Sequence, residues 1–122
     1  MEKLILDESM KLNNKRKMTT QEKNLLKELM NRGNFNPPFD WENNLLVSEM
    51  DDGNMGSLYL YPPGVTENNQ RSFGCQISEY RFRDIDNIDV IASLNLDIDG
   101  MLFELDIWKT NFKPTIFLSK KN

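Results

Sequence analysis

A cluster of oxygen-bearing side chains near the C-terminus has the clearest capacity for chemistry in this sequence. Asn95, Asp97, Asp99, Gly100 and Asp106 match the spacing of a calcium-binding loop, in which oxygen ligands precede an essential glycine and an acid closes the loop. The first position is not Asp and the last is not Glu. Both flanks alternate apolar and polar residues, whereas such a loop lies between two helices. The pattern therefore favours a β-hairpin over an EF-hand.

Three carboxylates are expected to share one face of that hairpin. Glu104 and Asp106 are two residues apart on one strand, so their side chains leave the same face of the sheet. Asp97 lies on the same face of the preceding strand, with Asn95 beside it. Such a cluster could raise the pKa of one carboxyl group, supply an acid/base pair or hold a cation. No aromatic-lined cleft can be recognised around these positions, which argues against the acid/base interpretation. A solvent-facing acidic surface is the commoner outcome of such a pattern, and a surface for a basic partner is the functional interpretation that we prefer.

The chain lacks the residues on which much other catalytic chemistry depends. It contains no histidine, which removes the commonest general base, the usual zinc ligand and the imidazole of any Ser-His or Cys-His pair. Its single cysteine, Cys75, alternates with Phe73 and Ile77 and is expected to be a buried structural thiol. We therefore expect no catalytic residue, no cofactor and no bound metal. A lone cysteine also precludes an internal disulfide and fits a reducing cytoplasm.

Length and charge limit the classes of protein and of binding partner that the sequence allows. The chain has 122 residues, enough for one domain with a modest core, and shows neither a membrane-spanning apolar run nor a secretory signal. Residues 1–36 hold eight Lys/Arg against five Asp/Glu, whereas residues 37–122 hold seven against fourteen, for an overall charge of −4. The acidic body argues against direct binding of nucleic acid, because phosphate repels it. It allows a basic protein partner.

Residues 20–31 are predicted to form the main helix. Thr19 as N-cap and Glu22 three residues later make a capping box, and Gly33 is a suitable stop. Four apolar residues recur at helical spacing and would form one buried face, namely Leu25, Leu26, Leu29 and Met30.

After Pro37 and Pro38 the apolar residues alternate with a period of two, which is typical of strands. Strands are predicted at 45–50, 55–61 and 71–82. The first two are expected to form a hairpin that turns at Asp52-Gly53, a favoured two-residue turn signal. The run from Asp84 to Asn87 is expected to be a turn.

The last two strands can be aligned residue by residue around Asp99-Gly100. The apolar side has the pairs Ile98–Met101, Leu96–Phe103, Leu94–Leu105 and Ala92–Ile107. The other side has Asp97–Leu102, Asn95–Glu104 and Ser93–Asp106. Trp108 falls on that second side, across from Ile91, which favours partial exposure. Both Trp41 and Trp108 could anchor an interface or pack in the core.

The sequence thus predicts an α+β fold, with an antiparallel meander sheet of about five or six strands and one main N-terminal helix packed on it. Residues 1–17 are expected to be a peripheral segment, and residues 18–122 to form a single domain. A short edge strand is expected at 115–118. Either this strand or the one at 45–50 could pair between chains and produce a homodimer.

A resemblance to a family of small bacterial proteins of uncharacterised function rests on three segments: MTTQEKNLLKELM, MDDGNMGSLYLY and SLNLDIDGMLFELDIWKTNF. It covers about residues 16–114, and DGMLFELDIWKTNFKP is its most specific part. The resemblance implies an immunity-protein-like function, in which a small acidic α+β protein neutralises a toxin domain. It implies no catalytic residue.

The expected function is therefore non-catalytic binding of a cognate protein, such as a basic toxin domain, by occlusion with an acidic surface. The candidate partner-binding residues are Asn95, Asp97, Glu104, Asp106, Asp51, Asp52, Asp84, Asp86, Asp89 and Trp108. Against a basic nuclease, the carboxylates would take the place of the substrate's phosphates. The alternatives are a carboxylate-based small-ligand or cation-binding protein or enzyme, and an uncharacterised homo-oligomeric scaffold protein.

Overall fold

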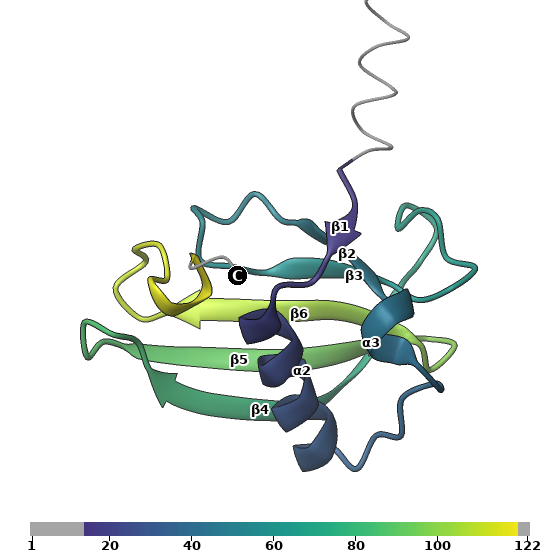
Figure 1. Ribbon diagram of the computed structural model, residues 1–122, viewed down its shortest axis with the longest axis horizontal. Helices are drawn as coiled ribbons and strands as arrows, with labels where there is room; N and C mark the ends of the chain where they lie inside the picture. The colour runs from purple at the N-terminus through teal and green to yellow at the C-terminus, as the bar shows by residue number, and fades with distance from the viewer. Residues whose placement is uncertain (1–13, 120–122) are drawn as a thin grey trace, which may run out of the picture.

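An antiparallel sheet with a helix across one face forms the body of the protein in the computed structural model, which describes residues 14–119 (Figure 1). Its strands in that range are β1 (Arg16–Lys17), β2 (Leu46–Glu49), β3 (Leu58–Tyr61), β4 (Phe73–Arg83), β5 (Asp89–Asp97) and β6 (Leu102–Lys109). They lie in the order β1-β2-β3-β6-β5-β4. The helices are α2 (Thr20–Arg32), the short α3 (Trp41–Asn44) and the 3-10 turn η1 (Phe117–Ser119). This arrangement confirms the predicted α+β class.

The N-terminal part of the sheet is short and tied to α2. Arg16 and Lys17 pair with β2, so the sheet begins two residues before the domain boundary that we set at residue 18. Arg16 also forms a two-pronged ion pair with Glu22, with both N–O distances at 2.8 Å. Residues 1–13 of the predicted peripheral segment lie outside the described residues. No helix between residues 14 and 119 is long and apolar enough to cross a bilayer.

The predicted capping box defines the start of α2. The Glu22 N–H donates to Thr19 Oγ1 at 3.2 Å, and the Thr19 N–H donates to Glu22 Oε1 at 2.9 Å. At the other end the Gly33 N–H donates to the Leu29 carbonyl at 3.0 Å. The predicted helix at 20–31 is therefore confirmed to within one residue.

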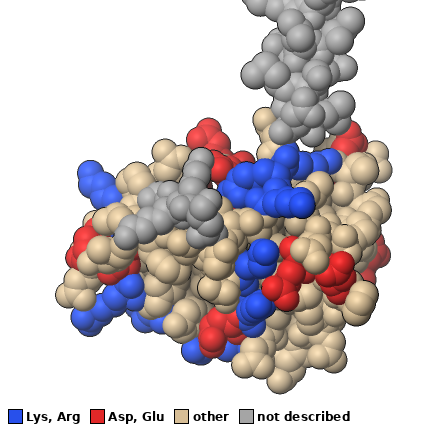
Figure 2. Space-filling view, in the orientation of Figure 1, with Lys and Arg blue, Asp and Glu red and all other residues tan. Residues whose placement is uncertain are grey.

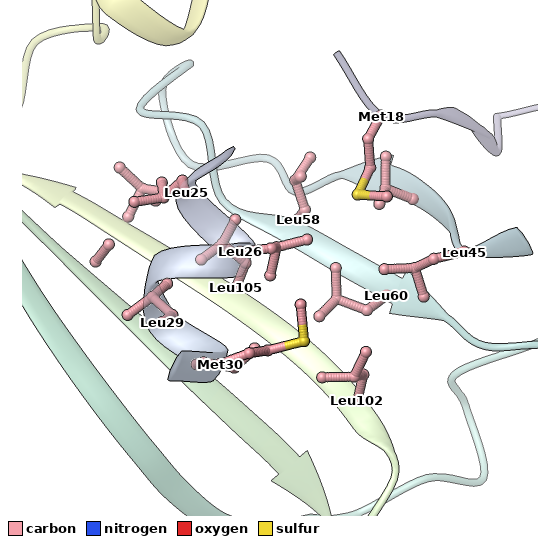
Figure 3. Packing of buried hydrophobic residues seen from close by; sticks show 14 of the residues in the cluster. Met18, Leu25, Leu26, Leu29, Met30, Leu45, Leu58, Leu60, Leu102 and Leu105 are labelled. Atoms are coloured by element: carbon pink, nitrogen blue, oxygen red, sulfur yellow. The ribbon is translucent and has the colours of Figure 1, made fainter. Parts of the chain in front are cut away.

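The core lies between α2 and one face of the sheet (Figure 3). Leu26, Leu29 and Met30 of α2 point toward leucines of β3 and β6, among them Leu60 and Leu105. Leu26, Leu29, Leu60 and Leu105 have no exposed surface. Trp41 of α3 is also buried in this core, which leaves Trp108 as the exposed tryptophan. Because the apolar face of each strand is buried against the helix, the opposite face of the sheet is the one that faces away from the core.

The hairpin of β5 and β6 has the predicted register over most of its length. The confirmed pairs are Ile91–Trp108, Ala92–Ile107, Ser93–Asp106, Leu94–Leu105 and Asn95–Glu104. Next to the turn, Leu96 pairs with Leu102, and the predicted Leu96–Phe103 pair is wrong. A register shift in the ladder causes the difference, because Phe103 becomes the extra residue of a bulge.

The hairpin of β2 and β3 is confirmed as antiparallel, but its predicted two-residue turn is wrong. Glu49 pairs with Leu58, so residues 50–57 all belong to the connection. The Asp52 carboxylate accepts the N–H groups of Met55 at 3.2 Å and Ser57 at 2.9 Å. These bonds across the loop stabilise a wide connection in place of a tight turn.

β4 departs from the predicted alternation at its start. Register shifts occur between Phe73 and Cys75 and between Gln76 and Ser78. As a result Phe73 is 55% exposed and Cys75 is exposed, so the prediction of a buried Cys75 is wrong. Gly74 is required between them, since any side chain there would collide with the backbone of β5 at its end.

The predicted edge strand at 115–118 is also wrong. Phe117 begins the 3-10 turn η1, and the N–H groups of Ile116 and Phe117 donate to the carboxylate of Asp84. The strand predicted at 45–50 corresponds to β2, which is covered by β1, and residues 115–118 form no strand. Neither segment is therefore an edge strand. The described sheet ends at β1 on one side and β4 on the other.

Candidate functional site

The face of the sheet opposite α2 carries the candidate side chains that the structure brings together. We call this the outer face; in Figure 1 it is turned away from the viewer, behind the sheet. It is formed by alternate residues of four strands, namely Tyr59 and Tyr61 of β3, Glu104, Asp106 and Trp108 of β6, Ile91, Ser93 and Asn95 of β5, and Glu79 and Arg81 of β4. Pairing in register aligns Tyr59, Glu104 and Asn95 across the sheet.

Glu104, Asn95 and Asp106 form the centre of the outer face. Asn95 is 4% exposed, and its Nδ2 donates to Asp106 Oδ2 at 2.8 Å. Its Oδ1 has no hydrogen-bond partner among the described residues. Burial and then the negative charge of Asp106 raise the pKa of Glu104, against smaller lowering effects of Asn95 and Arg71. The predicted carboxylate pair therefore exists, with a shared amide between its members.

Asp97 does not join that pair. It is 5% exposed and lies 2.9 Å from the Arg71 guanidinium, while its other oxygen accepts the N–H groups of Asp99 and Met101 at 2.9 Å. Burial alone would raise the pKa of Asp97, but the Met101 N–H and the Arg71 guanidinium outweigh it and lower the pKa. Asp97 therefore holds the turn between β5 and β6 and is not available to a partner.

The buried Asp84 and the exposed Asp86 are likewise engaged, because both pair with the side chain of Lys109. The Lys109 side chain has no exposed surface and donates to Asp84 at 2.9 Å and to Asp86 at 2.7 Å. Lys109 also donates to the Pro114 carbonyl at 3.3 Å, so this cluster joins the β4–β5 turn, β6 and the C-terminal segment. Sequence reasoning missed Lys109. Its position in the alternation Leu105, Ile107, Lys109 on the core side of β6 is a signal that could have identified it.

The other candidate acids are scattered. Asp89 lies 3.5 Å from both Arg81 and Arg83, and Asp52 holds its own loop. Asp51 is exposed in the same loop. Of the ten candidate residues, the outer face brings together four: Asn95, Glu104, Asp106 and Trp108.

An aromatic pair borders the carboxylates. Trp108 is 43% exposed and Phe112 is 70% exposed, with ring centroids 6.0 Å apart. Phe112 has a φ of 62°, a left-handed conformation that costs a bulky residue free energy. The Phe112 N–H donates to the Lys109 carbonyl at 2.8 Å, which holds this turn. Sequence reasoning missed Phe112, because a positive φ at a non-glycine residue leaves no pattern in the sequence.

Two clefts open among the described residues, and the smaller one lies on the outer face, where Tyr59 is the cross-strand neighbour of Glu104. One of about 590 Å³ lies between β1, the start of α2 and the β2–β3 loop, and one of about 470 Å³ lies beside Tyr59 and Tyr61. Neither is lined by Glu104 or Asp106. Among residues 14–119, no group of three or more His, Cys, Asp or Glu side chains is placed to hold a metal ion. The arrangement is suited to contact by charge and aromatic surface.

The opposite side of the molecule has a different charge pattern. Figure 2 looks onto the helix side, where Lys and Arg side chains extend from β1 over α2 with Asp and Glu between them. The basic residues of these two elements are Arg16, Lys17, Lys23, Lys27 and Arg32. The helix side therefore mixes basic and acidic side chains, while the outer face carries Arg81 and Arg83 of β4 besides the carboxylate pair.

Glu104→Gln is expected to increase the free energy of unfolding at pH 7 by about 0.5 kcal/mol, within the range of surface substitutions. The pKa of Glu104 is raised in the folded state, so the ionised group costs stability once the pH exceeds its ordinary value of 4.5. Below that value both states are protonated and the cost is absent. Urea unfolding of both proteins at pH 7 and pH 3.5 measures this, and a gain that is equal at both values contradicts it.

Comparison with known proteins identifies the family of the chain. A family model described as "Domain of unknown function (DUF6984)" matches residues 15–119. No curated protein and no solved structure matches the chain. The matched range includes every strand and helix described above, and the chain belongs to this family of small domains of unknown function.

Proposed function

We propose that this protein is a non-catalytic binding module of the immunity-protein kind, which neutralises a bacterial toxin by covering its functional surface with the outer face. The observation that carries the proposal is the juxtaposition of Glu104 and Asp106 with the exposed Trp108–Phe112 pair, on a sheet face that residues 14–119 leave open. Aromatic side chains supply much of the binding free energy at protein interfaces, and charges guide the approach of the partner.

The partner is a protein with a basic, partly apolar surface. Lys or Arg side chains of the partner would pair with Glu104 and Asp106, while an apolar residue would pack against the ring of Trp108. A cation beside Glu104 favours its ionised form, so binding would lower the raised pKa of that carboxyl group. If the toxin is a nuclease, the two carboxylates occupy the positions of substrate phosphates and binding is incompatible with substrate.

The fixed shape of the outer face supports this mode of action. Antiparallel pairing holds β3, β6 and β5 in register behind it, and the core fixes the opposite side of each strand. A rigid surface loses little conformational freedom on binding, which favours affinity. Occlusion of this kind needs no turnover and no group beyond the protein's own side chains.

The proposal is tested with the protein encoded by the neighbouring gene, expressed with and without this chain. We expect that protein to inhibit growth when expressed alone, and co-expression of this chain to restore growth. The double variant Glu104→Lys/Asp106→Lys should weaken binding by at least about 100-fold, because truncating or reversing charges in an interface costs several kcal/mol. Binding is measured by titration calorimetry at low and moderate salt.

A matched control carries the same change of charge on the helix side. Glu28→Lys/Glu42→Lys replaces two carboxylates that form exposed ion pairs with Arg32 and Lys27, so its net charge equals that of the test variant. The control should bind like the wild type. Equal weakening by both variants would show that overall charge is responsible, and restored growth with the test variant would exclude the outer face.

A further inference from the structure

β4 leaves one long edge of the sheet open. It is the last strand in the sheet order, and in the part of the chain that the structure describes its backbone pairs with β5 alone. Both register shifts lie before residue 78, and residues 78–83 then pair with β5 without interruption. We call residues 78–83 the edge segment. A regular, unpaired stretch of this kind can accept another strand.

The faces of the sheet restrict how a second copy could pair there. Directly opposed residues in an antiparallel ladder point to the same face, so outer-face residues must oppose outer-face residues. On the edge segment the outer-face residues are Glu79, Arg81 and Arg83, all exposed, and the half-buried residues between them belong to the core side. Only registers that place odd-numbered residues opposite odd-numbered residues therefore keep both faces continuous.

Charge selects one of these registers. With the twofold axis at Tyr80, Glu79 of each copy opposes Arg81 of the other, which gives two attractive pairs and no repulsive one. With the axis at Glu79 or at Arg81, two like charges oppose each other at the axis. Opposite charges directly across an antiparallel ladder stabilise it, and like charges destabilise it.

We propose that the protein forms a symmetric homodimer, in which the edge segments of two copies pair antiparallel about an axis at Tyr80. The sheet then continues through both copies, and Tyr80 of each copy faces its equivalent on the core side. Tyr80 is held there by a stacked contact with Phe82 at 5.5 Å and by the Arg32 guanidinium at 4.3 Å from its ring centroid.

The register shifts give this dimer a definite end. On the N-terminal side of residue 78 the strand is bulged at Ile77 and again near Gly74. Pairing between the two copies therefore cannot extend along the whole of β4. The pairing uses no residue of the Glu104–Asp106 pair and leaves Trp108 open. It therefore stands or fails independently of the proposed toxin binding.

The test is a charge swap measured by light scattering across a dilution series of the full chain. The wild type should reach twice the monomer mass of 14.3 kDa. Glu79→Arg and Arg81→Glu should each weaken dimerisation by roughly tenfold or more, because each turns two attractive pairs into two repulsive ones. The double variant Glu79→Arg/Arg81→Glu restores both opposed pairs and should dimerise like the wild type.

Two controls separate this geometry from simpler causes. Glu67→Arg, in the exposed β3–β4 loop, changes the net charge by the same amount as Glu79→Arg and should not affect dimerisation. Circular dichroism must show that the single variants remain folded. A wild type that stays monomeric throughout the series overturns the proposal, and so does a double variant that dimerises no better than the single variants.

Discussion

Asp84→Ala is expected to lower the free energy of unfolding by about 3 kcal/mol, the loss typical of removing one partner of a buried ion pair. Asp84 is 4% exposed and accepts from Lys109 Nζ at 2.9 Å and from the N–H groups of Ile116 at 2.8 Å and Phe117 at 2.9 Å. The substitution would leave the enclosed ammonium with the carboxylate of Asp86. It would also remove an acceptor from two backbone groups of the C-terminal segment.

Thermal and urea unfolding at pH 7 measure this loss, which corresponds to a fall of about 12 °C in Tm for a domain of this size. Asp86→Ala is the matched control. The Asp86 side chain is 36% exposed and contacts the same ammonium, so its removal should cost clearly less. Equal losses for the two variants would contradict a special role for Asp84.

Acid should weaken the wild type through the same carboxylate. Burial alone would raise the pKa of Asp84, but the hydrogen bonds from the Ile116 N–H, Lys109 and the Phe117 N–H lower it to about 2, against an ordinary value of 3.8. A folded-state pKa below the unfolded value stabilises the protein above pH 3.8, and this contribution is lost as the pH falls toward 2. Across that window the stability of the wild type should fall more steeply than that of Asp84→Ala.

Local signals were sufficient where neighbouring residues decide the structure. The capping box at Thr19 and Glu22 fixed the start of α2, because both of its hydrogen bonds lie within four residues. The alternation on both sides of Asp99 fixed the register of β5 and β6 up to the bulge at Phe103, because a one-residue slip would expose every apolar side chain.

Prediction from the sequence failed where a residue far away in the chain determines the local conformation or engages the side chain. The apolar segment at 115–118 has the composition of a strand, yet Asp84, more than 30 residues earlier, accepts two of its N–H groups and ends it as η1. Asp97 was assigned to the binding face, but Arg71 lies 26 residues earlier in the chain and engages its carboxylate. The Glu104–Asp106 pair was found because two adjacent strands alone create it.

Arg71→Met is expected to destabilise the protein by about 3 kcal/mol, because Asp97 would remain buried without its cation. The Arg71 side chain is 8% exposed and the Asp97 side chain 4%. Besides that ion pair, Arg71 donates to the Leu60 carbonyl at 2.6 Å and to Asn68 Oδ1 at 2.9 Å. Its guanidinium lies 4.8 Å from the ring centroid of Phe103. One side chain thus joins the ends of β3 and β6 to the turn after β5.

Arg71→Lys distinguishes charge from geometry. Lysine keeps the positive charge but lacks the planar fork with which arginine reaches several acceptors at once, so it should recover less than half of the lost stability. A double-mutant cycle with Asp97→Asn, measured by urea unfolding at pH 7, should give a coupling free energy of more than about 1 kcal/mol. Additive effects would mean that Arg71 stabilises the protein through its contacts with Leu60, Asn68 and Phe103, independently of Asp97. The same charge lowers the pKa of Glu104, so Arg71→Met should raise that pKa further and link this end of the sheet to the proposed binding surface.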